Sequence, residues 1–294
     1  MYKENLVLTF YAQTPIHMGS GISVSYVDNP VQREKHTEFP ILAASGIKGV
    51  IRDLALRIWQ NKNKVEVIFG PEPGEGQEFA SCISLTDAKI LLFPVRSVRG
   101  VFAYITCPYI LKRFKNELKS IGKDNLPEIE DLEISDSEII VHSNSKLNID
   151  ENKVVLEEFV FNIKSKNKDE LVKELLEYLP NEINPLLNEH FAIVSDDVFK
   201  DFAKYAVEIR TRIRIDQITG TAAERALFEI ELLPSETVFY GFIFITDPYN
   251  KSVEKIQTAN NVASEIEKLL QQNSIIQLGG DETLGMGLMR VKVK

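Results

Sequence analysis

The 294-residue sequence is poor in the residues that build zinc sites and disulfide frameworks. It has two cysteines, Cys82 and Cys107, and four histidines. None of these six residues has a partner at the spacing of a zinc site, so a structural zinc is not expected. The two cysteines are predicted to be reduced thiols.

Long apolar runs are also absent. The longest one, VFYGFIFI at 238–245, is far shorter than the ~20 residues that a membrane helix needs, and it predicts a buried strand instead. The chain opens MYKENLVLTF, without a charged-then-apolar leader. We expect a cytoplasmic protein with no membrane partner.

Charge is unevenly distributed along the chain. The net charge is −9, but residues 116–201 contain 21 acidic and nine basic residues, a net charge of −12, so the other segments sum to +3. An acidic insertion on a mildly basic body is compatible with a phosphate-bearing partner, without requiring one.

The predicted elements follow the order strand, helix, short strands, then strand, helix, strand, which is typical of a ferredoxin-like α+β core with insertions. Helices are expected at 45–60, 108–120, 168–179, 195–206 (capped by Ser195 or Asp196) and 258–272. Strands are expected at 5–14, 79–85, 89–93, 101–106, 154–163, 237–246, 275–278 and in the terminal LMRVKV.

A long loop follows the first strand. PIHMGSGISVSYVDNPVQREKHTEFP, at 15–40, has no helical or alternating pattern, and a loop of about 26 residues in a compact domain is usually functional or disordered. Taken alone, Asp28 is a turn residue of an Asp-Asn-Pro sequence and His17 an ordinary loop histidine.

The start of the 45–60 helix is a candidate anion site. Ser45 is a plausible N-cap, and Lys48 and Arg52 lie four residues apart on one face, close to the free backbone N–H groups and the positive end of the helix dipole. The simpler interpretation is a solvated helix face.

Residues 207–234 are predicted to form two strands with an extended tip. Arginines at 210, 212 and 214 alternate with apolar residues on the first strand, and Glu229 and Glu231 alternate with apolar residues on the second. A solvated hairpin with charge pairs across its strands is one interpretation.

Near the C-terminus, GGDETLGMG contains Gly279, Gly280, Gly285 and Gly287, which would let the backbone approach another strand or a phosphate closely. GGDE also opens the diguanylate cyclase signature. Only one strand follows it, which leaves no room for the rest of such a domain.

Together these motifs resemble one family. TPIHMGSG, YVDNPVQRE, TEFPILAASGIKGVIR, TGTA…ALFEIELLP and GGDETLGMG are similar to the RAMP superfamily, specifically the repeated backbone subunit of the Cmr (type III-B CRISPR) RNA-silencing complex. The resemblance spans nearly the whole chain, and it departs at LAAS, where a glycine is expected before the helix.

The resemblance implies an RRM-like palm (5–110 and 237–294), an acidic insertion (116–201), a protruding thumb β-hairpin (207–234) and a catalytic loop (15–40). Such subunits polymerise along a guide RNA (crRNA) in antiviral defence, and the paired target single-stranded RNA is cut at regular intervals. The implied partners are guide RNA, target RNA, further copies of this chain and other Cmr subunits.

The resemblance also implies roles for single residues. Asp28 would be the general base for the 2′-OH or a ligand of a weakly bound Mg²⁺ or similar divalent cation, and His17 would orient the phosphate or protonate the leaving oxygen. Glu229 or Glu231 would assist. The residues expected to contact RNA are Arg33, Ser45, Lys48, Arg52, Gly285 and Gly287.

Two other functions stay open at this point. The chain could be a non-catalytic RNA-binding scaffold of the same kind of complex, in which case another subunit would cut. A nucleotide cyclase, from a literal interpretation of GGDE, predicts nucleotide turnover without RNA.

Overall fold

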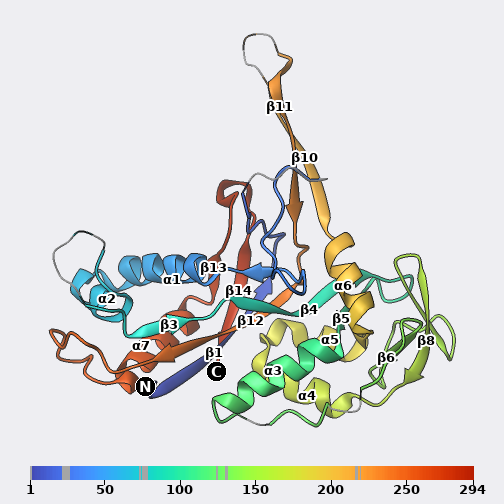
Figure 1. The fold of residues 1–294 in the computed structure, drawn as a ribbon, viewed down its shortest axis with the longest axis horizontal. Coiled ribbons are helices and arrows are strands. Elements are labelled where there is room, and N and C mark those ends of the chain that lie inside the picture. Colours follow the sequence, from blue (N-terminus) through green and yellow to red (C-terminus); the bar gives the residue numbers. More distant parts are fainter. Residues whose placement is uncertain are drawn as a thin grey trace.

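A computed structural model describes residues 2–21, 27–72, 74, 79–123, 125–129, 132–215, 218 and 220–294. The fold is α+β: one large mixed sheet runs through the body with helices packed against it, and a separate two-stranded hairpin projects away from the body (Figure 1).

The strands, in chain order, are β1 (Glu4–Ala12), β2 (Ile41–Leu42), β3 (Ile83–Leu85), β4 (Ala88–Arg96), β5 (Phe102–Thr106), β6 (Glu138–Val141), β7 (Lys153–Leu156), β8 (Phe159–Ser165), β9 (Phe191–Ile193), β10 (Glu208–Ile215), β11 (Ala222–Leu232), β12 (Val238–Ile245), β13 (Ile275–Gln277) and β14 (Leu288–Val293). The helices are α1 (Ala44–Trp59), α2 (Lys62–Phe69), α3 (Pro108–Ser120), α4 (Asp169–Tyr178), η1 (Asn181–Ile183), α5 (Asn184–His190), α6 (Asp196–Tyr205), α7 (Ala259–Gln272) and η2 (Glu282–Leu284).

The main sheet has the strand order β13-β14-β1-β12-β4-β5-β9-β6-β8-β7, with β2 on β4 and β3 on β12. Strand β1 lies inside it, antiparallel to both β12 and β14. Its residues from Leu6 to Ala12 are all buried, because helices and loops cover both faces of the strand. The sheet continues beyond β5 into 116–201, where β9 pairs with β5 in parallel.

The expected buried strand at 238–245 is confirmed as β12, which is paired on both sides and buried along nearly its whole length. Within the part of the chain that the structure describes, no helix combines the length and the apolar character needed to cross a bilayer.

Two expectations about helix ends have different outcomes. Ser195 caps α6, since its side chain accepts a hydrogen bond from the Val198 N–H. The prediction that Ser45 caps α1 is wrong: the N-cap is Ala43, whose side chain has no acceptor, and the Ala44 N–H donates to the carboxylate of Asp87 at 2.8 Å. A residue from a distant loop therefore replaces the local cap.

Two stretches contain more elements than the sequence pattern indicates. The single strand expected at 154–163 is a hairpin, β7 and β8, which turns at Glu157 with a φ of 48°. Helix α2 and the short elements β6, α5 and β9 were not predicted, because each is too short to show a period.

The hairpin β10–β11 is confirmed, but the expected charge pairs across it are wrong. Arg210 lies opposite Ile230 and Arg212 opposite Phe228, whereas Glu229 lies opposite Thr211 and Glu231 opposite Ile209. Directly opposed residues share a face, so this register places the arginines and the glutamates on different faces. Residues 216, 217 and 219 of the predicted extended tip lie outside the described residues.

Candidate functional site

The loop after β1 runs alongside the base of the hairpin. The Asn29 N–H donates to the Glu229 carbonyl at 3.1 Å, and the Glu231 N–H donates to the Asn29 carbonyl at 3.0 Å. Asn29 thereby forms a parallel bridge with Ile230 on the edge of β11 that β10 leaves open. This pairing fixes the position of the predicted catalytic loop, of which residues 22–26 lie outside the description.

Asp28 is exposed at the point where the loop joins β11. Its Oδ2 accepts a hydrogen bond from the Glu229 N–H at 2.9 Å. No hydrogen bond to Oδ1 is found among the residues that the structure describes. Among these residues the carboxylate is therefore held by one oxygen, and the side chain is exposed.

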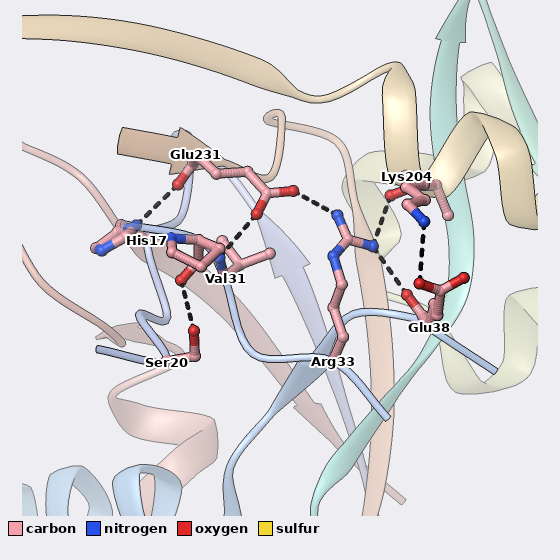
Figure 2. A network of polar contacts seen from close by, with 9 residues as sticks. His17, Ser20, Val31, Arg33, Glu38, Lys204 and Glu231 are labelled. Carbon is pink, nitrogen blue, oxygen red and sulfur yellow. Dashed lines mark hydrogen bonds and ion pairs between the residues drawn. The ribbon is translucent and has the colours of Figure 1, made fainter. Parts of the chain in front are cut away.

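His17 is attached to the same edge of the same strand. Its Nδ1 lies 2.8 Å from the Glu231 carbonyl oxygen (Figure 2). A carbonyl oxygen can only accept, so Nδ1 carries the proton and the neutral ring presents the lone pair of Nε2. Along a strand, residues two apart direct their backbone groups to the same side, so Asp28 on Glu229 and His17 on Glu231 are neighbours.

Glu231 itself is occupied by the protein. Its side chain is 1% exposed; one carboxylate oxygen accepts from the Val31 N–H at 2.8 Å, and the other pairs with the guanidinium of Arg33. Arg33 also donates to the carbonyls of Glu38 at 2.9 Å and Ala203 at 3.0 Å (Figure 2). Both side chains are thus engaged in contacts within the protein. Glu231 was expected to assist catalysis and Arg33 to contact RNA.

Glu38 extends this network to α6. Its carboxylate lies 3.0 Å from Lys204 and 3.3 Å from Lys200, and hydrogen bonds from these two lysines hold the pKa of the Glu38 carboxyl below its usual value. The turn at Glu38, whose φ is 61°, is thus fixed at the C-terminal end of α6.

Glu229 differs from Glu231 in its side chain. It is partly exposed and lies opposite Thr211, and its carboxylate has no ion pair with any residue in the described ranges. Both its N–H and its carbonyl bind the loop. Of the two candidate glutamates, Glu229 is the one whose carboxylate can reach solvent next to Asp28.

The glycine-rich loop packs under His17. The Gly280 N–H donates to the His17 carbonyl at 2.9 Å, and a Cβ on Gly279 would lie 2.4 Å from that oxygen. A Cβ on Gly287 would lie 2.0 Å from the Leu278 carbonyl oxygen. Of the two partners considered for these glycines, protein backbone is the one found here.

Gly285 is different, because it is exposed and has no atom within 4 Å of a Cβ position, although its φ is 72°. The same loop is tied to the hairpin by an ion pair of 2.8 Å between Asp281 and Arg212, and Met286 packs on Ile230 and Leu232. The hairpin base is therefore held on two sides.

The start of α1 forms a second polar region. Lys48 is half-buried, and burial together with the nearby charge of Arg52 lowers its pKa below the usual value. No carboxylate pairs with Lys48 within the described part of the chain. Ser45 is exposed in the first turn. An unpaired, partly desolvated ammonium beside a helix N-terminus is suited to an anion.

Arg52 is engaged differently from Lys48. It donates to the Gly70 carbonyl at 2.5 Å, just after α2, and lies 3.9 Å from Glu72. Helix α1 also reaches the first region, because Gly46 lies against Met18, the neighbour of His17. The two polar regions are thus on adjoining parts of the surface.

The donor set for a metal is small. The described residues contain no group of three or more His, Cys, Asp or Glu side chains that could hold an ion. Mg²⁺ usually keeps several waters and needs only one or two protein carboxylates, and the exposed Asp28 carboxylate is a donor of that kind.

The Arg33–Glu231 pair and the pairing of Asn29 with β11 could not be found in the sequence. The two charged residues are 198 positions apart, and each is one of many charged residues with no local pattern around it. Only the folded chain shows that the predicted loop and the predicted hairpin form one site.

Comparisons with known proteins identify the family of the chain. The model of the RAMP superfamily matches residues 9–290. The chain is 40% identical, over 97% of its length and 94% of the relative, to the CRISPR system Cmr endoribonuclease Cmr4 of Pyrococcus furiosus.

Solved structures give the same result. The crystal structure of oligomeric Cmr4 from Pyrococcus furiosus matches with a TM-score of 0.76 at 33% identity, over 99% of this chain and 97% of that one. A type III-B Cmr-beta complex bound to cognate target RNA contains a chain with a TM-score of 0.77 at 23% identity, over 99% and 98%, which shows the shared fold. The chain belongs to the RAMP superfamily and, within it, to the family of the Cmr subunit Cmr4.

Proposed function

We propose that the chain is a guide-RNA-binding filament subunit of a type III-B complex that cuts the paired target RNA by attack of a 2′-OH. In this proposal the carboxylate of Asp28 is the catalytic group that acts as general base. One observation carries the proposal. At the base of a projecting hairpin, the exposed Asp28 carboxylate accepts a hydrogen bond at Oδ2 from the Glu229 N–H, next to a histidine whose Nδ1 is bound to the Glu231 carbonyl.

The fold supports a palm and a thumb. The strands β14-β1-β12-β4 are neighbours in that order, and α1 and α7 connect strands among them, which supports the proposal of a ferredoxin-like palm. The hairpin β10–β11 projects from the body as a thumb would (Figure 1).

For guide RNA, the start of α1 is the proposed contact. Lys48 supplies a cation that no carboxylate among the described residues pairs with, and the backbone N–H groups of Ser45 and Gly46, with the Ser45 hydroxyl, supply donors to a phosphate. Base pairing with the guide reads the target sequence, so the protein needs to contact only the sugar-phosphate backbone of the RNA. Arg52 lies one turn further along α1 and is bound to the Gly70 carbonyl. Gly285 has open space where a Cβ would lie, so its backbone is accessible to RNA.

For target RNA, the hairpin is the proposed wedge. Ile213 and Leu227 face each other across it at 52% and 66% exposure, and Ile218 is 96% exposed. Apolar side chains inserted at a base step unstack it and bend the strand. A strand splayed in this way can align a 2′-OH with its own phosphate, which a regular A-form helix prevents.

The chemistry follows from the two loop side chains, Asp28 and His17, that are bound to the backbone of β11. The Oδ1 of Asp28 takes the proton of the 2′-OH, whose oxygen then attacks the adjacent phosphorus, and the P–O5′ bond breaks. Nε2 of protonated His17 gives a proton to the leaving 5′-oxygen. The products are a 2′,3′-cyclic phosphate and a 5′-hydroxyl. As the alternative to acting as the base, Asp28 would hold a divalent cation, which would offset negative charge on the phosphate.

The test is reconstitution of the complex with guide RNA and labelled complementary RNA, with Asp28→Asn compared to the unmodified chain. Loss of a general base lowers the single-turnover rate by about 10²- to 10⁴-fold. Target binding should stay unchanged, because the amide keeps the shape of the side chain. Cutting at the same positions and rate would overturn the proposal and favour a scaffold role.

Product spacing gives a second readout of the same experiment. One catalytic acid in each stacked copy produces cuts with the period of the filament, and mixed complexes with Asp28→Asn copies should lose individual cuts. A cutting subunit elsewhere in the complex would give products that do not depend on Asp28.

A further inference from the structure

We propose that the ion pair between the buried Glu231 and the partly buried Arg33 is a positioning device that fastens the loop to β11 and thereby places the Asp28 carboxylate. The inference rests on the proposed role of Asp28. It makes Arg33 and Glu231 positioning residues, neither of which contacts RNA.

The first argument is burial. The side chain of Glu231 is 1% exposed and that of Arg33 16%, so neither can reach a substrate in this arrangement. The guanidinium already donates to two backbone carbonyls and one carboxylate. A buried ion pair adds little net stability compared with apolar residues of the same size, so a geometric role explains it better than a stabilising one.

The second argument is connectivity. The Glu231 carboxylate binds the loop at two points, the Val31 N–H and the Arg33 side chain, while its own backbone carbonyl binds His17. Arg33 connects the same carboxylate to the turn at Glu38 and to the carbonyl of Ala203 in the last turn of α6. A cation is favoured at that helix end. One ion pair therefore ties the loop, the hairpin and α6 together (Figure 2).

The third argument is the short distance along the chain from this pair to Asp28. Only Asn29 and Pro30 separate Asp28 from Val31. Asn29 is paired with β11, and the Pro30 carbonyl accepts from both the N–H and the hydroxyl of Ser20. The proline ring also fixes its own φ. With Val31 anchored, little backbone freedom remains between the pair and the carboxylate.

The decisive variant is the double substitution Arg33→Met with Glu231→Met. It replaces both charges by apolar side chains of similar length, so neither ion is left buried alone. In the assembled complex we expect a thermal midpoint close to that of the unmodified chain, target affinity within about twofold and a single-turnover cutting rate lowered about 100-fold, as a displaced reacting group causes.

Two single substitutions test rescue. Arg33→Lys keeps a cation but loses the forked geometry, and Glu231→Gln keeps an acceptor for the Val31 N–H. Both should cut faster than the double variant and slower than the unmodified chain. A purely structural role predicts instead that the rates follow the thermal midpoints of the variants. If the double variant does not fold, the comparison of these two singles decides between the roles.

Hydrogen exchange on the full chain without RNA reports loop placement independently of cutting. The amides of Asn29, Val31 and Glu229 should exchange at least 10-fold faster in the double variant, and amides in β1 and β12 should not change. Loop amides that stay protected, or a double variant that cuts at the normal rate, would overturn the proposal.

The same data separate this inference from the proposed function. If Asp28→Asn cuts normally while the double variant loses loop protection, the role of Asp28 is wrong and the positioning of the loop stands. If Asp28→Asn is inactive while the double variant cuts normally, the role of Asp28 stands and the positioning is wrong.

Discussion

The two polar regions of this molecule are built in opposite ways. At the start of α1, Ser45 and Lys48 follow each other within one turn of helix, and the local sequence places them. At the base of the hairpin, His17 and Asp28 of the loop are joined to Glu231 and Glu229 of β11 by hydrogen bonds between side chains and backbone.

This difference has a consequence for how each region responds to change. Where a helix places the side chains, one substitution removes one contact. Where long-range hydrogen bonds place them, one substitution releases a segment. We therefore expect that removing one partner of a long-range contact at the hairpin base lowers both stability and the precision of the site, and that a substitution at the helix start lowers affinity alone.

The largest effect is expected for Glu231→Ala. It leaves the Arg33 guanidinium buried without its partner, which should lower the free energy of unfolding by about 3–5 kcal/mol, measured by urea titration. The matched control is Glu229→Ala, two residues away and partly exposed, with an expected change within about 0.5 kcal/mol. Equal effects of the two substitutions would show that the ion pair with Arg33 does not make Glu231 more important for stability than Glu229.

A second prediction compares two glycines of the same loop. Both Gly285 and Gly287 have a positive φ, at 72° and 74°, but only Gly287 meets backbone, at 2.0 Å from its Cβ position. Gly287→Ala should cost about 2–4 kcal/mol and Gly285→Ala about 1–2 kcal/mol, both measured as the urea midpoint. Similar costs would show that Gly287 is not held by close packing.

A third prediction concerns Lys48. Lys48→Met should weaken guide RNA binding and reduce the slope of log K against log salt by about 0.7, the value for one phosphate contact on a single strand. Cutting at saturating RNA should not change. Arg57→Met is the control, because Arg57 is exposed at the other end of α1 and pairs with Asp53. An unaltered salt slope would exclude a phosphate contact by Lys48.

The smallest effect is a pH dependence at the same residue. In the folded chain without RNA, burial lowers the pKa of Lys48 below its ordinary value of 10.5. A bound phosphate would raise this pKa again. Binding then takes up a proton, so guide affinity should fall as the pH rises from the lowered pKa towards 10.5. Lys48→Met should abolish this decline, and a decline that persists in the variant would assign it to another group.

Much of the fold was predictable because periodicity and caps are local. The strand at 238–245, the helices at 108–120 and 258–272, and the hairpin at 207–234 were all found from their own residues. The N-cap of α1 was not, because Asp87 supplies the acceptor from 43 residues away. Helix α2 and strand β9 owe their form to packing on neighbours.

The candidate site was predictable only as separate parts. The loop was singled out for its length and Asp28 for its motif, and both predictions remain to be tested. That Glu231 is buried while Glu229 reaches the surface follows from the position along β11 at which Val31 and Arg33 of the loop bind Glu231, which no alternation of residues along the hairpin reveals.

The pairing of Asn29 with β11 also changes how the molecule behaves among its neighbours. A hairpin that shows isoleucines and an uncovered row of N–H and C=O groups is a template for strand addition by any unfolded chain nearby. Residues 28–31 pair with the N–H and C=O groups of β11 near the body and so leave fewer of them open to strand addition. Chains whose loop has come loose should therefore precipitate sooner on storage, whether or not RNA is present.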